Sequence, residues 1–216
     1  MTTIADVRTE PDTSTSLLRV LLIGAPLLMA VARVLLVPLD DQDWGGTMDR
    51  MAAHTARSDL GWFLAMAASG LLAITGVLLA QRVHAAGRVR AATVSMITIS
   101  LGWAACAAIC VSGLLLGVIA KAADRPVQIQ IQKDFNSNAA GLPFLLCGLA
   151  AIGYVVLGVA LARSGRATKG AAILVALGGA ATLLTMPGPL TPLLVLTALL
   201  LAAGHVLTLR ADAVDA

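Results

Sequence analysis

Long apolar runs separated by short polar segments cover most of this chain. The runs occupy residues 17–39, 60–80, 92–120, 142–162 and 170–209. A helix of about 20 apolar residues crosses a bilayer, so each of the first four runs predicts one crossing. The last run contains 40 residues without a charge, which is enough for two crossings. Pro187, Gly188 and Pro189 near its middle predict the turn between them.

This pattern predicts an all-α polytopic membrane helix bundle with about six transmembrane helices. The fifth, at 170–186, is short enough to lie shallow or tilted. Arginine and lysine favour cytoplasmic loops. With the N-terminus inside, the cytoplasmic segments hold nine of these residues and the opposite segments hold five. We therefore expect both termini in the cytoplasm, with 1–16 as a disordered tail, 17–209 as the transmembrane domain and 210–216 as a second tail.

The first apolar run also resembles a signal peptide, because Ala30, Val31 and Ala32 follow a short apolar core. Apolar sequence resumes at Val34 and continues to Leu39, which favours a span that is retained. A cleaved leader is the weaker alternative.

Composition agrees with a membrane protein and disfavours other classes. Hydrophobic residues make up 58% of the chain and charged residues 12%, with a mean hydropathy of +0.89. A soluble domain of this size cannot bury that much apolar surface. The formal net charge of +3 comes from residues scattered at helix ends, so we expect no nucleic-acid partner. The lipid bilayer is the first expected partner, and the cell (plasma) membrane is the expected location.

The first segment expected outside the membrane, 40–59, begins with an acidic cluster and then predicts a short helix. Thr47 is placed to cap a helix that runs to residue 56, with Met48 and Met51 on its apolar side. A helix of this kind lies on the membrane surface.

The second such segment, 121–140, contains a run in which apolar residues alternate with glutamine. Val127, Ile129 and Ile131 are the apolar members, and their spacing is the period of a half-buried strand. A single strand cannot satisfy its own edges. We therefore expect this run to lie extended over the bundle or to pair with another chain, as a partner-docking segment.

Four charged residues near the end of the first span are candidates for function. Arg33 lies within the span, five residues before Pro38. From there its side chain can reach the outer interface and pair with Asp40, Asp41 or Asp43. The alternative is a contact with a substrate, since charges inside a membrane are costly and often functional. The aspartates also suit a divalent cation, but they lack the other ligands of a calcium loop, so a solvated acidic turn is favoured.

Small residues form a stripe along the third span at spacings of four and three. Its main members are Gly102, Cys106, Cys110, Gly113 and Gly117. Such a stripe lets a neighbouring helix approach closely, with cysteine acting as a small apolar residue. The alternative is a metal site that Cys106 and Cys110 share with Cys147 of the fourth span, which needs further ligands. We favour the helix-packing seam and expect no metal and no cofactor.

The sequence carries no recognisable catalytic or haem-binding pattern. A bis-histidine haem needs two imidazoles that face each other inside the bundle. His54 and His84 lie in loops, and only His205 is near a span. No P-loop, nucleophile-elbow, Rossmann or zincin motif occurs. We therefore expect a protein that is not an enzyme.

Three short stretches carry a resemblance to a group of known proteins. They are Val37-Pro38-Leu39-Asp40 at the end of the first span, Met51-Ala52-Ala53-His54 in the outer segment, and Leu60-Gly61-Trp62 at the start of the second span. With the basic inner loop before the third span, they make the chain similar to uncharacterised six-helix membrane proteins of high-GC bacteria. The resemblance covers most of the chain and implies a bacterial multi-pass membrane protein, with no activity attached.

Abundant packing seams, two outer segments and few reactive groups favour an accessory or assembly subunit beside a larger membrane protein. The expected partner is that protein or a second copy of this chain. The alternative is a small transporter or lipid-binding protein that uses Arg33 as an anion contact. Thr75, Thr98 and Ser112 would then line its cavity. A redox enzyme that binds haem or quinone is a third class.

Overall fold

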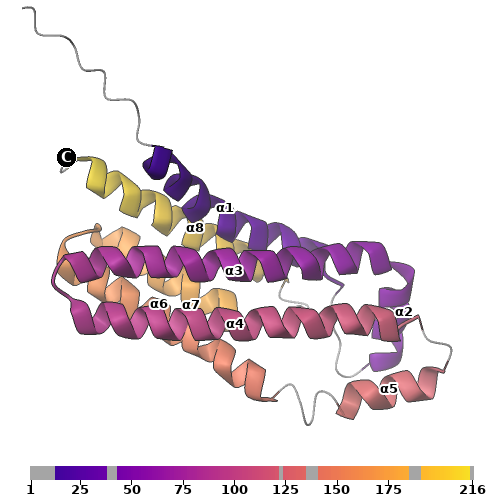
Figure 1. Cartoon of the computed structure of the whole chain (residues 1–216). Coiled ribbons are helices and arrows are strands. Elements are labelled where there is room, and N and C mark those ends of the chain that lie inside the picture. The colour runs from indigo at the N-terminus through magenta and orange to yellow at the C-terminus, as the bar shows by residue number, and fades with distance from the viewer. Residues whose placement is uncertain (1–12, 38–42, 122–123, 135–140, 185–190, 215–216) are drawn as a thin grey trace, which may run out of the picture.

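The computed structural model describes residues 13–37, 43–121, 124–134, 141–184 and 191–214. In this part of the chain the regular secondary structure is helical, and no strand occurs. The helices are α1 (Thr13–Leu35), α2 (Trp44–Ala53), α3 (Thr55–Ala85), α4 (Val89–Ile119), α5 (Arg125–Asp134), α6 (Gly141–Ser164), α7 (Lys169–Leu184) and α8 (Thr191–Val214). Two of them, α2 and α5, are short and lie together beyond one end of the long helices (Figure 1).

The six long helices form a closed ring. In this ring α1 packs against α3, α3 against α4, α4 against α6, α6 against α7, α7 against α8, and α8 against α1. Helices α3 and α6 also touch each other across the ring. Short connections join α3 to α4 and α6 to α7, which leaves each pair antiparallel and side by side (Figure 1). The segments that contain α2 and α5 join α1 to α3 and α4 to α6.

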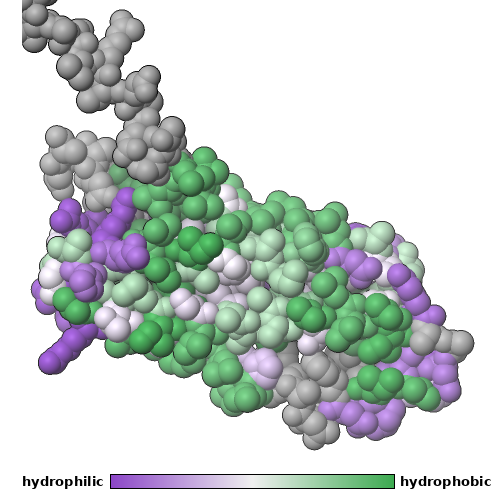
Figure 2. Space-filling view, viewed as in Figure 1, coloured by the Kyte–Doolittle hydropathy of each residue, from purple (hydrophilic) through white to green (hydrophobic). Residues whose placement is uncertain are grey.

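Among the described helices, four are long and apolar enough to cross a membrane. They are α1 from Leu17, α3, α4, and α6 from Leu145. Helices α7 and α8 contain shorter apolar stretches, Lys169–Ala181 and Val195–Leu209, within the same ring. Figure 2 shows apolar surface over the middle of the bundle and polar surface at its two ends. The prediction of an all-α fold is confirmed. The four long apolar helices and the apolar middle of the bundle are compatible with a membrane protein.

Several helix ends differ from the sequence prediction. Helix α1 begins at Thr13, inside the expected tail, and α8 continues to Val214, inside the second expected tail. Helix α3 begins at Thr55, five residues before the predicted apolar run. Polar residues can extend a spanning helix because its ends lie in water or among lipid headgroups. The turn predicted at 187–189 lies outside the described residues.

The segment between α1 and α3 folds as α2, which begins before Thr47, so the predicted cap is wrong. Asp43 precedes the helix instead, and its Oδ1 accepts a hydrogen bond from the backbone N–H of Gly46 at 2.8 Å. Met48 and Met51 are buried against the ends of α1 and α4. The apolar side of α2 therefore covers the end of the bundle and does not face a membrane surface.

The segment between α4 and α6 forms α5, so the strand predicted at 127–132 is wrong. Gln128 is only 2% exposed, and its Oε1 accepts a hydrogen bond from Nη1 of Arg125 at 2.7 Å. Ile129 is partly buried, whereas Val127 and Ile131 are exposed. Residues four apart share a face of a helix, so the alternating sequence also gives a helix with one glutamine inward and two apolar residues outward.

Candidate functional site

The two ends of the ring differ in charge. The loops between α3 and α4 and between α6 and α7 form what we call the basic end. Its charged residues are Arg82, Arg88, Arg90, Arg163, Arg166 and Lys169, and segments 81–90 and 163–169 contain no Asp or Glu. The beginning of α1 and the C-terminal end of α8 lie at the same end (Figure 1). The opposite end carries α2 and α5, and we call it the α2–α5 end.

Arg33 lies near the C-terminal end of α1 and turns toward other helices of the ring. Its Nε is buried and has no hydrogen-bond partner. The groups that interact electrostatically with its guanidinium are the thiols of Cys110, Cys106 and Cys147. These cysteines belong to α4 and α6, so Arg33 joins a cluster built from three helices.

The aspartates that the sequence offered as partners for Arg33 are placed differently. Asp43 caps α2 and forms no ion pair with Arg33. Asp40 and Asp41 lie outside the described residues. Within the part of the chain that the structure describes, no three metal-ligating side chains come together. In the described structure the titratable groups that act electrostatically on Arg33 are therefore thiols, where the sequence analysis expected carboxylates.

Helices α4 and α6 approach each other closely at Gly102. A Cβ atom on Gly102 would lie 2.3 Å from the backbone nitrogen of Ala150. One turn further along α4, the Sγ of Cys106 lies 2.9 Å from the Sγ of Cys147. Both cysteines are free thiols. The first half of the small-residue stripe thus faces α6.

The second half of the stripe faces α3. A Cβ atom on Gly113 would lie 2.3 Å from the ring of Trp62, and one on Gly117 would lie 2.4 Å from Oδ1 of Asp59. Cys110, between the two halves, is buried in the core. The stripe therefore contacts two helices, because α4 packs between α3 and α6.

Trp103 and Tyr154 form a buried polar contact between helices of the ring. Both side chains are fully buried. The indole N–H of Trp103 donates to the hydroxyl of Tyr154 at 3.3 Å, and that hydroxyl donates to the carbonyl of Leu72 at 3.4 Å. The contact links α4, α6 and α3. The sequence analysis missed it, because an aromatic residue in an apolar span gives no sign of its partner.

The hydroxyl groups proposed to line a cavity with Arg33 bond within their own helices. Thr75, Thr98 and Ser112 each donate to a backbone carbonyl three or four residues earlier. This is the usual partner of a hydroxyl inside an apolar helix. The structure does not gather these three side chains around Arg33.

The three histidines differ in burial. Nδ1 of His205 lies 2.6 Å from the carbonyl oxygen of Leu22, in the contact between α8 and α1. Its Nε2 is buried without a partner. His54 and His84 are exposed. His205 is therefore buried between two helices, whereas the other two imidazoles are exposed.

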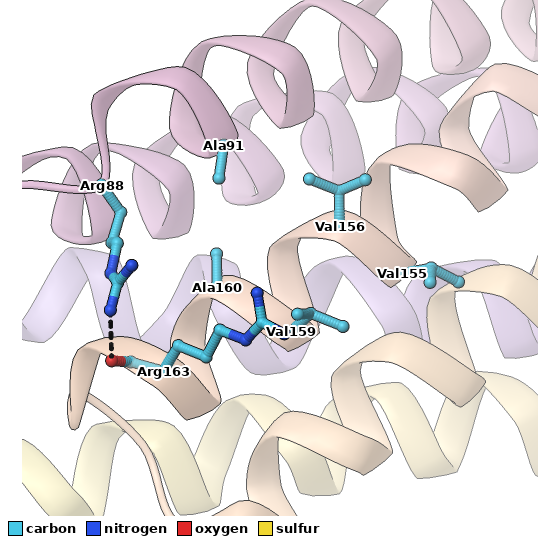
Figure 3. A pocket seen from close by; sticks show the side chains of 7 residues that line it. All are labelled: Arg88, Ala91, Val155, Val156, Val159, Ala160 and Arg163. Atoms are coloured by element: carbon cyan, nitrogen blue, oxygen red, sulfur yellow. Dashed lines mark hydrogen bonds between the residues drawn. The ribbon is translucent and has the colours of Figure 1, made fainter.

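A groove between α4 and α6 opens at the basic end (Figure 3). It has a volume of about 290 Å³ and is lined by Arg88, Ala91, Val155, Val156, Val159, Ala160 and Arg163. Nη2 of Arg88 donates to the carbonyl oxygen of Arg163 at 3.4 Å. Figure 3 shows the guanidinium of Arg163 extending along α6 to a position beside Val159. The sequence analysis used these arginines only for orientation, because they lie 75 residues apart.

At the α2–α5 end, an ion pair between Arg125 and Asp49 holds α5 against α2. Val127 is 50% exposed and Ile131 is 44% exposed on the outward side of α5. Helix α5 is not among the candidate spans. The sequence analysis predicted an extended docking segment here, and the structure shows that the segment is helical.

Comparisons with protein-family models, with curated proteins and with solved structures return no match for this chain. Function is therefore inferred from the sites alone.

Proposed function

We propose that the chain is an accessory or assembly subunit of the bacterial cell membrane that packs against a larger membrane protein. In this proposal all six long helices cross the bilayer, and both termini lie in the cytoplasm. The basic end then faces the cytoplasm, because short loops rich in arginine are retained there. The α2–α5 end lies on the other side and carries the docking surface.

The observation that carries this proposal is the apolar pair Val127 and Ile131 on the outward side of α5. The two residues are four apart, so they form one stripe on a helix. Exposed polar residues, Gln130 and Lys133, lie on the same helix. An apolar centre with a polar rim is typical of protein interfaces, and an amphipathic helix of this kind fits a groove on a partner.

The attachment of α5 suits such a role. Helix α5 packs on α2, and its link to α2 includes the ion pair between Arg125 and Asp49. Met48 and Met51 in turn fix α2 to the end of the bundle. The docking helix is thus held in place by a buried support while its own apolar stripe stays uncovered.

The test is native gel electrophoresis of mildly solubilised membranes from cells that produce the tagged chain. The wild-type protein should migrate in a complex much larger than the 22.0 kDa chain. Replacing both Val127 and Ile131 with Glu should release the chain from that complex. Lys133→Glu changes a charge elsewhere on α5 and should leave the complex intact.

Two outcomes would overturn the proposal. One is a wild-type chain that runs alone, with no membrane complex altered when the gene is deleted. The other is a complex that survives the double substitution on α5. Migration at only twice the chain's own mass would replace the larger partner with a second copy.

A second candidate function is lipid binding, and the groove in Figure 3 favours it. Arg88 and Arg163 stand at the basic end of a wall made by Val155 and Val159. Both valines are nearly half exposed on the outside of the bundle, where acyl chains lie. An anionic phospholipid matches this arrangement, with its phosphate at the arginines and one chain along the valines.

Native mass spectrometry of the detergent-solubilised protein tests the lipid site. Phosphatidylglycerol should be retained better than phosphatidylcholine with the same acyl chains. Replacing both Arg88 and Arg163 with Gln should weaken this retention about 30-fold, from roughly 1 kcal/mol per cation. Arg90→Gln is the control, because Arg90 is exposed on the same end of α4. Equal retention of the two lipids, or full competition by inorganic phosphate, would contradict lipid recognition.

A further inference from the structure

The contact between α4 and α6 follows a regular antiparallel register that ends in two cysteines. Gly153 packs on Ile99, with a would-be Cβ atom 3.0 Å from the Ile99 backbone nitrogen. Gly102 packs on the backbone of Ala150 in the same way. The next position in this register pairs Cys106 with Cys147. At these glycines the helix backbones approach so closely that a side chain would not fit, which explains why two short thiol side chains meet.

The two sulfur atoms are close to bonding distance. Their separation is 2.9 Å, whereas a disulfide bond is about 2.05 Å long. A shift of less than about 1 Å would therefore join them. Cys106 donates its thiol hydrogen toward the sulfur of Cys147. This geometry makes Cys147 the sulfur that carries negative charge when one proton leaves the pair.

Arg33 supplies the counter-charge from a third helix. Its Nε is buried without a partner, and its guanidinium interacts electrostatically with both members of the pair. A buried cation in a membrane is costly unless an anion is nearby. A neighbouring arginine favours the thiolate, which is the reactive form of cysteine. The arginine and the thiols thus stabilise each other's charged forms.

We propose that Cys106 and Cys147 are a redox-active pair that forms a reversible disulfide between α4 and α6. Arg33 is a positioning residue that stabilises the thiolate of Cys147. The electron acceptor is a lipid-soluble quinone. The pair lies within helices surrounded by hydrocarbon, where an oxidant must dissolve in lipid, and Cys106 is only partly buried.

The reaction balances with one quinone. The two S–H bonds break and one S–S bond forms, which releases two electrons and two protons. The quinone takes up both electrons, and its two carbonyl oxygens take up the two protons to give the hydroquinone. A dithiol reductant or a hydroquinone pool of lower potential reverses the reaction.

The experiment uses the full chain, reduced, reconstituted into vesicles without oxygen and mixed with a short-chain benzoquinone analogue. The quinone absorbance should fall by one equivalent per chain, and the protein should lose about 2 Da, as a two-electron oxidation requires. Alkylation after unfolding in detergent should then show Cys106 and Cys147 protected and Cys110, which is buried in the folded chain, still reactive. This measurement needs no substitution and so does not depend on the stability of a variant.

Substitutions test the role of each cysteine and of Arg33 in quinone reduction. Cys106→Ala and Cys147→Ala should each abolish quinone reduction, and Cys110→Ala should preserve it. Arg33→Gln should slow the reaction at least about tenfold by removing the charge that favours the thiolate. Arg33→Lys should recover most of the rate, and Arg90→Gln, at the basic end, should leave the rate unchanged.

Three results would overturn the inference. The first is a wild-type protein that leaves the quinone oxidised while a water-soluble thiol oxidant joins the cysteines. The second is protection of Cys110 in place of Cys106 or Cys147. The third is an Arg33→Gln rate equal to the wild-type rate.

Discussion

Substituting Gly102 with alanine adds one methyl group at the closest point between α4 and α6. The added Cβ would lie 2.3 Å from the Ala150 backbone nitrogen, whereas ordinary contacts begin at 3.4 Å. The helices must therefore separate locally by about 1.1 Å, the difference between these two distances. Because the obstacle is backbone, no side-chain rotation relieves it. Overpacking of this kind costs about 1–3 kcal/mol, which outweighs the gain of at most about 1 kcal/mol from a better helix former.

The matched control is Gly148→Ala on α6, which makes the same chemical change. Nothing lies within 4 Å of a Cβ atom at Gly148, so only the gain in helix propensity remains. Thermal unfolding of both purified variants in one detergent measures the difference. We expect the Tm of Gly102→Ala to fall by about 2–12 °C, from roughly 2–4 °C per kcal/mol. The Tm of Gly148→Ala should rise slightly or stay the same. Equal Tm values for the two variants would refute the close approach of the backbones.

Two further predictions concern polar contacts at opposite extremes of burial. Tyr154→Phe leaves the indole N–H of Trp103 without its acceptor inside the ring, so the free energy of unfolding should fall by about 1–3 kcal/mol. Ser112→Ala, at a partly buried hydroxyl, is its control and should change stability by less than about 0.5 kcal/mol; equal losses would contradict the network. Arg125→Ala breaks the ion pair with Asp49, whose side chain is 68% exposed. Its cost should be at most about 1 kcal/mol and should shrink in high salt, and a salt-independent loss would point to packing instead.

The long apolar runs were sufficient to predict the helices, because a spanning helix satisfies its own backbone hydrogen bonds and needs only a long apolar surface. The same reasoning failed for α5. Gln128 lies buried against the protein, and the alternation of apolar and amide residues fits a strand or a helix equally well until the neighbours of each side chain are known. The cap of α2 was misplaced for a related reason, since both Asp43 and Thr47 are good capping residues.

The small-residue stripe on α4 was visible in the sequence, but its neighbours were not. Spacings of four and three place Gly102 and Gly117 on one face of the helix. The local sequence does not predict that Gly102 contacts α6 and Gly117 contacts α3. The groups around Arg33 could not be predicted from the sequence either. A long flexible side chain near a span end reaches both inward and outward, and only the position of α4 and α6 turns it toward thiols.

The sequence alone determined the positions of the six long apolar helices, because these positions follow from the order of apolar and polar residues along the chain. The tertiary structure alone decided that the helices close into a ring, that Cys106 meets Cys147, and that Arg88 and Arg163 share a groove. These contacts join residues far apart in the chain, and they depend on how closely the helix backbones approach. That distance is set jointly by residues on two helices, so no single segment of the sequence contains it.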